Sequence, residues 1–246
     1  MAEVIVALDF SSGEEAFSLV ERLGEAGTFY KVGLELYTAE GPSVVRKLRE
    51  AGKHVFLDLK LHDIPHTVSG AVRSAARAGV RLLTLHTVGG RSMLEAAVEA
   101  AREAAHGEEE RLRLLGVTVL TSLSASEVEG TWGRSILSLR DEVVRLGTLA
   151  ASSGLDGAVA SVLEARELKR KLGGDFLVVT PGIRLPGGES HDQARVATPG
   201  AAVRAGADYL VVGRAVTRAP DPREALEWIQ DELGPPARNG REVAGG

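Results

Sequence analysis

Eight short apolar runs recur along the chain, and a segment with helical character follows each of them. The runs contain few polar positions, which is typical of parallel strands whose outer face is covered. The predicted strands are Val4–Leu8, Thr28–Gly33, His54–Leu61, Val80–Leu85, Arg111–Leu120, Gly157–Ser161, Phe176–Thr180 and Tyr209–Val212. The predicted helices are Gly13–Ala26, Thr38–Ala51, Pro65–Ala78, Arg91–His106, Ser138–Ser152, Leu163–Leu172, Pro199–Ala205 and Pro222–Glu232.

Alternation of strands and helices favours an α/β fold in which one sheet closes into a single (β/α)8 TIM barrel. The length of 246 residues agrees with this, because such barrels typically have about 250 residues. A doubly wound open sheet is the alternative, but no G-x-G-x-x-G follows the first strand. We expect the catalytic barrel to occupy residues 1–232 and the tail, residues 233–246, to be disordered.

Composition excludes several classes of protein. The absence of cysteine rules out disulfides, thiolate metal sites and a cysteine nucleophile. A net charge of −5 gives no basic surface for nucleic acid. No basic segment precedes the first apolar run, and no run reaches the roughly 18 residues of a membrane helix. We therefore expect a soluble, cytoplasmic protein that binds neither nucleic acid nor membrane.

The third apolar run carries charged residues at its end. Asp58 and Lys60 are two positions apart, so strand geometry predicts that their side chains share one face. Asp63 follows just beyond the strand. Charges held together in an apolar setting are costly, which indicates a functional cluster. The chain has six lysines against 23 arginines, and lysine, unlike arginine, can release a proton near neutral pH when its pKa is shifted.

Polar residues also occur at the ends of other predicted strands. In a barrel these ends meet at one mouth, where the active site lies. Taken singly, each residue has an ordinary explanation as a helix cap, a turn residue, a surface ion pair or a buried histidine. Their joint placement predicts an active site formed by Asp9, Lys31, Asp58, Lys60, His86, Thr121, Arg184 and Arg214.

The loops after the seventh and eighth strands pair glycine with arginine, in Pro181–Arg184 and Val212–Arg214. Barrels often bind phosphate there, because glycine lets the backbone approach an anion and arginine offers a fork of donors. Gln193 lies just beyond the first of these loops. His62 and His66 are four residues apart, but they lie around a predicted strand-to-helix turn and so do not form a helical zinc motif. Nearby lysines would also compete with a cation. The residues thus predict a metal-free enzyme that acts on a small phosphorylated anion.

The segment Asp58–Thr67 resembles the signature of the orotidine 5′-phosphate decarboxylase family. Further segments resemble the family in order and approximate spacing, namely Ala7–Asp9, Lys31–Gly33, Leu120–Ser122, Val179–Arg184, Asp192–Pro199 and Val211–Arg214. The resemblance implies decarboxylation of orotidine 5′-phosphate to UMP without a cofactor, the last step of de novo pyrimidine synthesis. It also implies a homodimer in which Asp63 and Thr67 reach the partner's site.

The resemblance further implies individual roles. Lys60 would stabilise negative charge at C6 of the ring and supply the proton that replaces carbon dioxide, with Asp58 against the departing carboxylate. The implied binding residues are Asp9 and Lys31 for the ribose, Thr121 for the pyrimidine, Gln193, Gly213 and Arg214 for the phosphate, and Pro181 and Arg184 in the same ligand-binding set. His86 would lie behind the site. The loop 185–191 is the candidate lid, or else a passive surface loop.

Two other functions remain as alternatives. Magnesium-dependent 3-keto-L-gulonate 6-phosphate decarboxylases and hexulose-phosphate synthases resemble this chain through the same Asp-x-Lys-x-x-Asp. They place a glutamate on the second strand to help hold the metal, whereas this chain has Lys31, which would repel magnesium. The other alternative is a non-catalytic nucleotide-binding barrel, which would have no need of Lys60.

Overall fold

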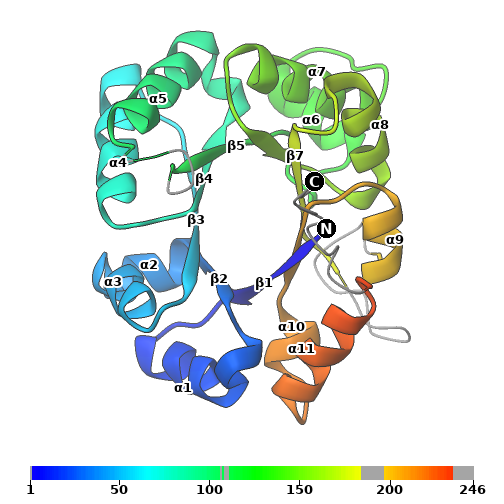
Figure 1. Cartoon of the computed structure of the whole chain (residues 1–246). Helices are drawn as coiled ribbons and strands as arrows, with labels where there is room; N and C mark the ends of the chain where they lie inside the picture. Colours follow the sequence, from blue (N-terminus) through cyan, green and yellow to red (C-terminus); the bar gives the residue numbers. More distant parts are fainter. Residues whose placement is uncertain (1, 106, 108–110, 184–196, 235–246) are drawn as a thin grey trace, which may run out of the picture.

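The computed structural model describes residues 2–105, 107, 111–183 and 197–234. Within these residues eight parallel strands pair in sequence order, and β8 pairs with β1, so the sheet is a closed barrel (Figure 1). The strands are β1 (Glu3–Leu8), β2 (Phe29–Gly33), β3 (His54–Leu61), β4 (Leu82–His86), β5 (Arg113–Val117), β6 (Gly157–Val159), β7 (Leu177–Thr180) and β8 (Tyr209–Val212). The predicted barrel is confirmed, and the open sheet is excluded.

Helices surround the barrel on its outer side (Figure 1). They are α1 (Gly13–Leu23), α2 (Leu34–Glu40), α3 (Ser43–Glu50), α4 (Pro65–Arg77), α5 (Arg91–Glu103), α6 (Ala125–Trp132), α7 (Leu139–Ser152), α8 (Val162–Leu172), α9 (Pro199–Arg204), α10 (Arg214–Thr217) and α11 (Pro222–Asp231), with short 3-10 turns at η1 (Gly24–Ala26) and η2 (Thr87–Gly89). Most begin where the sequence predicts. The Ser12 hydroxyl, for example, caps α1 by accepting a hydrogen bond from the Glu15 N–H.

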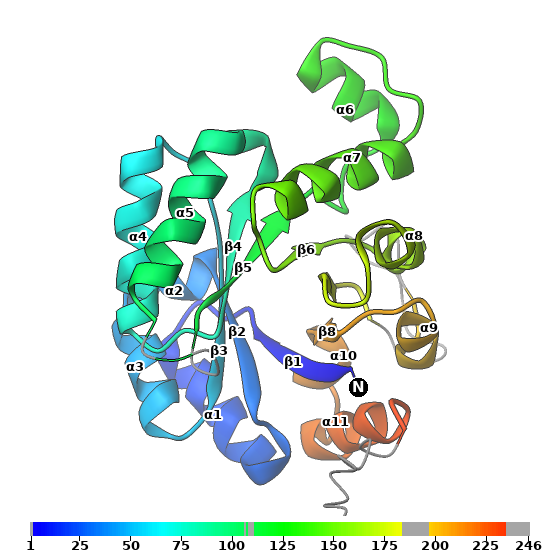
Figure 2. The same cartoon turned by 45° about the horizontal axis from the view of Figure 1, so that its top comes forward.

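Three helical features differ from the prediction. The single helix expected over Thr38–Ala51 is wrong, because Gly41 has a φ of 62° and Pro42 follows it, which separates α2 from α3. The sequence reading also missed α6, which projects beyond the ring of helices (Figure 2), and the short α10. The predicted tail falls mostly on residues 235–246, which lie outside the described part of the chain.

The core has two layers. Strand residues that point outward pack against the helices, and those that point inward fill the barrel with the buried side chains of Ile5, Ala7, Phe29, Phe56, Leu82, Leu115, Val179, Tyr209 and Val211. Packing inside is tight around Gly157, where an added Cβ would lie 2.3 Å from the backbone oxygen of Leu177. Because these described side chains fill the interior, a ligand of the barrel is expected at its mouth.

The strand β3 is irregular where it reaches that mouth. Leu57 pairs with Leu83 and Leu61 pairs with Leu85, so four steps along β3 match two along β4. Lys60 lies inside this bulge with a φ of 51°, and it is the only non-glycine residue of the described chain with positive φ. Such a conformation costs roughly 1–3 kcal/mol and persists where surrounding contacts enforce it. The backbone is therefore strained at the lysine that the sequence singles out.

Candidate active site

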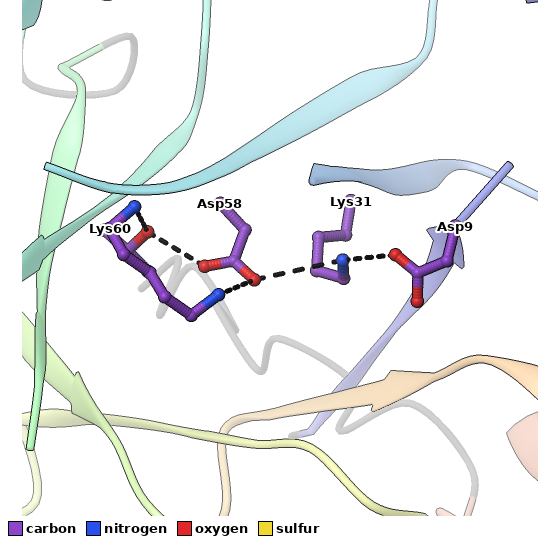
Figure 3. A network of polar contacts seen from close by, with 5 residues as sticks. Asp9, Lys31, Asp58 and Lys60 are labelled. Carbon is purple, nitrogen blue, oxygen red and sulfur yellow. Dashed lines mark hydrogen bonds and ion pairs between the residues drawn. The ribbon is translucent and has the colours of Figure 1, made fainter. Parts of the chain in front are cut away.

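Four charged side chains, one just after β1 and three on β2 and β3, form a row across the mouth of the barrel, with signs that alternate along it (Figure 3). We call Asp9, Lys31, Asp58 and Lys60 the charged array. The Lys31 Nζ is 2.7 Å from Asp9 Oδ1 and 3.8 Å from Asp58 Oδ2. The Lys60 Nζ lies 2.9 Å from the same Asp58 oxygen. The Asp58 carboxylate is thus held between two ammonium groups.

Burial differs along the array. The side chains of Lys31 and Asp58 are 11% and 13% exposed, whereas Lys60 is 31% and Asp9 62% exposed. Buried charges are tolerated when they are paired and hydrogen-bonded, and the alternation of sign meets this condition. Lys31 and Asp58 therefore form the buried part of the array, and the Lys60 ammonium is more accessible to a ligand.

A cavity of 140 Å³ opens beside the array. Its lining combines charged and polar groups with apolar walls, as is usual for small-molecule sites. The lining residues are Lys31, Phe56, Asp58, Lys60, Val117, Val119, Leu120, Thr121, Val159, Val179, Pro181 and Val211. A larger hollow of 530 Å³ lies on the outer helices, but no residue of the charged array lines it. We therefore place the candidate site at the barrel mouth.

Glycine and arginine after β8 lie at the Asp9 end of the array. A Cβ added to Gly213 would be 3.8 Å from the Cβ of Ala7 and 4.0 Å from Asp9 Oδ2. Arg214 follows as the first residue of α10. Two other residues predicted for ligand binding, Arg184 and Gln193, lie outside the described residues, as does the loop 185–191.

Asp63 and Thr67 stand apart from the charged array in the single chain. Both are exposed, and the Asp63 carboxylate accepts a hydrogen bond from the N–H of Ile64 at 2.6 Å. Among the described residues, no ion pair joins Asp63 to Lys31 or Lys60. In the described part of the chain, Asp63 therefore takes no part in the ion pairs of the charged array, and Thr67 lies exposed in the first turn of α4.

His86 lies behind the array at the end of β4. Its ring centroid is 5.7 Å from that of His62. Burial lowers the pKa of His86 below its usual value, and the positive charges of His62 and Lys60 lower it further. The neutral imidazole is thus favoured at neutral pH, which agrees with a supporting position and adds no further charge to the site.

The sequence reading missed Thr84, which lies on β4 and is fully buried. Its hydroxyl accepts a hydrogen bond from the backbone N–H of Lys60 and donates one to Asp58 Oδ1, both at 2.9 Å. A threonine inside an apolar run, LLTLH, is the only signal in the sequence.

In the described part of the chain, no group of three acidic or histidine side chains could hold a metal ion.

Comparison with known proteins decides the family. The sequence model of the orotidine 5′-phosphate decarboxylase / HUMPS family matches residues 2–229. The orotidine 5′-phosphate decarboxylase of Lysinibacillus sphaericus is 46% identical over 227 residues, which is 92% of this chain and 96% of that protein. The enzyme of the same name from Chromobacterium violaceum is 47% identical over 230 residues, covering 94% and 91% of the two chains. This chain belongs to the orotidine 5′-phosphate decarboxylase / HUMPS family.

A solved structure of a family member agrees with this placement. The crystal structure of orotidine 5′-phosphate decarboxylase from Lactobacillus acidophilus superposes with a TM-score of 0.86 at 37% identity, covering 96% of this chain and all of the other. The family match from residue 2 to residue 229 includes all eight strands. The family match therefore covers the whole barrel, including every residue of the charged array.

Among the helices of the described residues, none has the length and apolar character that a membrane span requires.

Proposed function

We propose that this chain is an orotidine 5′-phosphate decarboxylase, which converts orotidine 5′-phosphate to UMP and carbon dioxide at the end of de novo pyrimidine synthesis. The observation that carries this conclusion is the Lys60 ammonium, held 2.9 Å from Asp58 beside the cavity at the barrel mouth. The close relatives named for this reaction span almost the whole chain. For this decarboxylation, the charged array has to stabilise negative charge on the pyrimidine ring and supply a proton.

Lys60 is the proposed acid. Loss of carbon dioxide leaves an electron pair on C6 of the pyrimidine, and this carbanion is poorly stabilised in water. An ammonium group fixed next to C6 stabilises the developing charge because it needs no reorganisation during the reaction. Once the C6–carboxyl bond has broken, the electron pair on C6 takes a proton from Lys60 to form the new C6–H bond, and solvent returns a proton to the neutral lysine. Arginine could not serve, because its guanidinium does not lose a proton near neutral pH.

Asp58 and Lys31 are the proposed supports of that acid. Asp58 Oδ2 contacts both ammonium groups, so it fixes the direction in which Lys60 points. We place the substrate carboxylate against Asp58. When that carboxylate leaves as carbon dioxide, the repulsion between the two negative groups is removed. The array is preorganised for the charge of the transition state.

The remaining substrate groups are assigned along the array. We propose that Asp9 and Lys31 bind the ribose hydroxyls, and that Thr121 and Pro181, which line the cavity, contact the pyrimidine. The phosphate would lie near Gly213 and Arg214, together with Gln193 and Arg184. Support comes from the order of the array, since Gly213 lies beside Asp9 at one end and Lys60 lies at the other.

We also propose a homodimer in which Asp63 and Thr67 complete the partner's site. Their exposure supports this assignment, and so does the absence, among the described residues, of an ion pair between Asp63 and the array. A carboxylate arriving from a second chain would add a negative group next to Lys60 and would balance its positive charge.

A magnesium-dependent reaction on keto-sugar phosphates is the less favoured function. Lys31 places its ammonium 3.8 Å from Asp58 Oδ2, and Lys60 contacts the same oxygen. A divalent cation at this carboxylate would have to displace or approach two positive charges. The contacts therefore argue for a substrate that the lysines bind directly.

Product analysis tests the assignment. Purified protein is incubated separately with orotidine 5′-phosphate and with 3-keto-L-gulonate 6-phosphate plus magnesium, and the products are separated by chromatography. We expect UMP in the first reaction and unchanged sugar phosphate in the second. Turnover of the sugar phosphate without UMP formation would overturn the assignment.

A further inference from the structure

Thr84 connects the two central residues of the site through one hydroxyl group. The oxygen accepts from the Lys60 N–H and donates to Asp58 Oδ1, each at 2.9 Å. A hydroxyl offers one donor and two acceptor positions, so both contacts can form together. Thr84 comes from β4, whereas Asp58 and Lys60 belong to β3. The hydroxyl therefore joins neighbouring strands where their regular register is broken.

The bulge in β3 makes this connection necessary. Because four steps along β3 match two along β4, the Lys60 N–H has no place in a regular ladder, and the Thr84 side chain supplies its acceptor. A buried N–H without a partner is costly. The hydroxyl thus supports the Lys60 backbone at a φ of 51°. In this conformation the Lys60 ammonium contacts Asp58.

The second hydrogen bond orients the carboxylate. Asp58 Oδ1 accepts from Thr84, while Asp58 Oδ2 faces the ammonium groups of Lys31 and Lys60. With one oxygen fixed, rotation of the carboxylate away from Lys60 would break a buried hydrogen bond. Thr84 is fully buried and does not line the cavity, so it acts through its neighbours and does not touch a ligand there.

We propose that Thr84 is a positioning residue, whose hydroxyl fixes both the strained backbone of Lys60 and the carboxylate of Asp58 for decarboxylation. This inference rests on the proposed function for its effect on rate. Its geometric part, the dependence of the Lys60 conformation on the hydroxyl, stands apart from any activity.

Three variants separate this role from general stability. Thr84→Val removes the hydroxyl and keeps the branched shape, and Thr84→Ser keeps the hydroxyl. Thr87→Val is the matched control, because Thr87 is also fully buried but its hydroxyl has no hydrogen-bond partner in the described part of the chain. Steady-state kcat and KM for orotidine 5′-phosphate and the melting temperature are measured for each variant.

We expect Thr84→Val to lower kcat about 10- to 100-fold, as for loss of a hydrogen bond to a charged group. KM should match that of Thr87→Val, but the melting temperature of Thr84→Val should be lower, because the Lys60 N–H loses its acceptor. Measured where all variants are folded, Thr84→Ser should recover kcat to within about threefold. Wild-type kcat in Thr84→Val would overturn the proposal, and so would an equal loss in Thr87→Val or no recovery with serine. If the valine variant does not fold, Thr84→Ala replaces it. Failure of both to fold, while serine folds, would also overturn it.

Crystal structures of the wild type, Thr84→Val and Thr84→Ser form the second arm. We expect Lys60 to leave positive φ, or its contact with Asp58 to break, only in the valine variant. An unchanged Lys60 and Asp58 in that variant would contradict the proposal. A wild type that does not decarboxylate orotidine 5′-phosphate would refute the proposed function, while this comparison would still decide whether Thr84 fixes the lysine.

Discussion

The Lys60 ammonium and the Asp58 carboxylate form an ion pair of 2.9 Å across a bulge in the strand that carries both. Strand alternation alone predicts that the two side chains share a face. The structure brings them together by a different route, with Lys60 at a φ of 51°. Strained backbone of this kind concentrates at functional sites, where other contacts enforce it. The pair is therefore a preorganised element and more than a surface ion pair.

Neutralising Asp58 should slow the reaction without weakening substrate binding. In Asp58→Asn the lysines lose their shared anionic partner, so we expect kcat to fall about 100-fold or more. KM for orotidine 5′-phosphate should not rise, because the substrate carboxylate no longer faces a negative group. Steady-state kinetics check both values. Asp231→Asn, on the exposed end of α11, is the control, and a similar effect there would contradict the account.

Mixing two inactive variants should restore activity if the sites are shared between chains. We expect Lys60→Ala and Asp63→Ala each to be nearly inactive alone. In a hybrid dimer one site has both residues altered, and the other site combines intact Lys60 with the partner's intact Asp63. Activity should therefore recover to about a quarter of the wild-type rate when subunits exchange at random. No recovery, with exchange verified by mass spectrometry, would show that Asp63 acts within its own chain or not at all.

Gly157 should be among the positions least tolerant of a side chain. A Cβ there would lie 2.3 Å from the backbone oxygen of Leu177, and neighbouring strands cannot separate without breaking hydrogen bonds. We expect Gly157→Ala to lower the free energy of unfolding by about 1–3 kcal/mol. Gly70→Ala, inside α4 with no atom within 4 Å of the added Cβ, should raise it by about 0.5–1 kcal/mol. Urea denaturation measures both, and equal effects would contradict the packing described for the barrel.

His86 should make stability depend on pH in mildly acidic solution. Burial, His62 and Lys60 lower its pKa in the folded chain, so the unfolded chain binds more protons in a window just below about pH 6.5. The free energy of unfolding therefore falls as pH falls through that window. Burial, Arg81 and Arg49 lower the pKa of His54 in the same way.

Substitution of the two histidines tests this linkage. We expect His86→Asn and His54→Asn each to reduce the slope of unfolding free energy against pH between about 5 and 6.5. The double variant should have the flattest profile. Urea denaturation at several pH values gives the slopes, and profiles parallel to the wild type would contradict the pKa directions.

The barrel and most of the charged array follow from patterns that the sequence displays directly. Apolar runs of strand length identify the eight strands, and residues such as Asp9 and Lys31 stand out because strand ends converge in a barrel. The break between α2 and α3 was also readable, since Gly41-Pro42 is a common stop signal. The α6 helix left a weaker trace, because only Val128 of its residues is buried. Its capping box of Ser124 and Glu127 was the available clue.

The backbone of Lys60 and the role of Thr84 could not be read in this way. Lysine is not a residue that favours positive φ, so its type gives no hint of the bulge. The hydrogen bonds of Thr84 join residues 24 and 26 positions apart in the chain. Such contacts depend on the register between β3 and β4, which apolar periodicity does not specify when a bulge intervenes.

The most direct test of the central claim is a metal-free assay of Lys60. Wild type and Lys60→Ala are treated with EDTA and given orotidine 5′-phosphate, and the loss of orotate absorbance is followed. We expect the wild type to turn over at the same rate with and without added magnesium. Lys60→Ala should be at least about a thousandfold slower, since it lacks both the charge and the proton. Equal rates in the two proteins, or turnover that requires magnesium, would contradict the account.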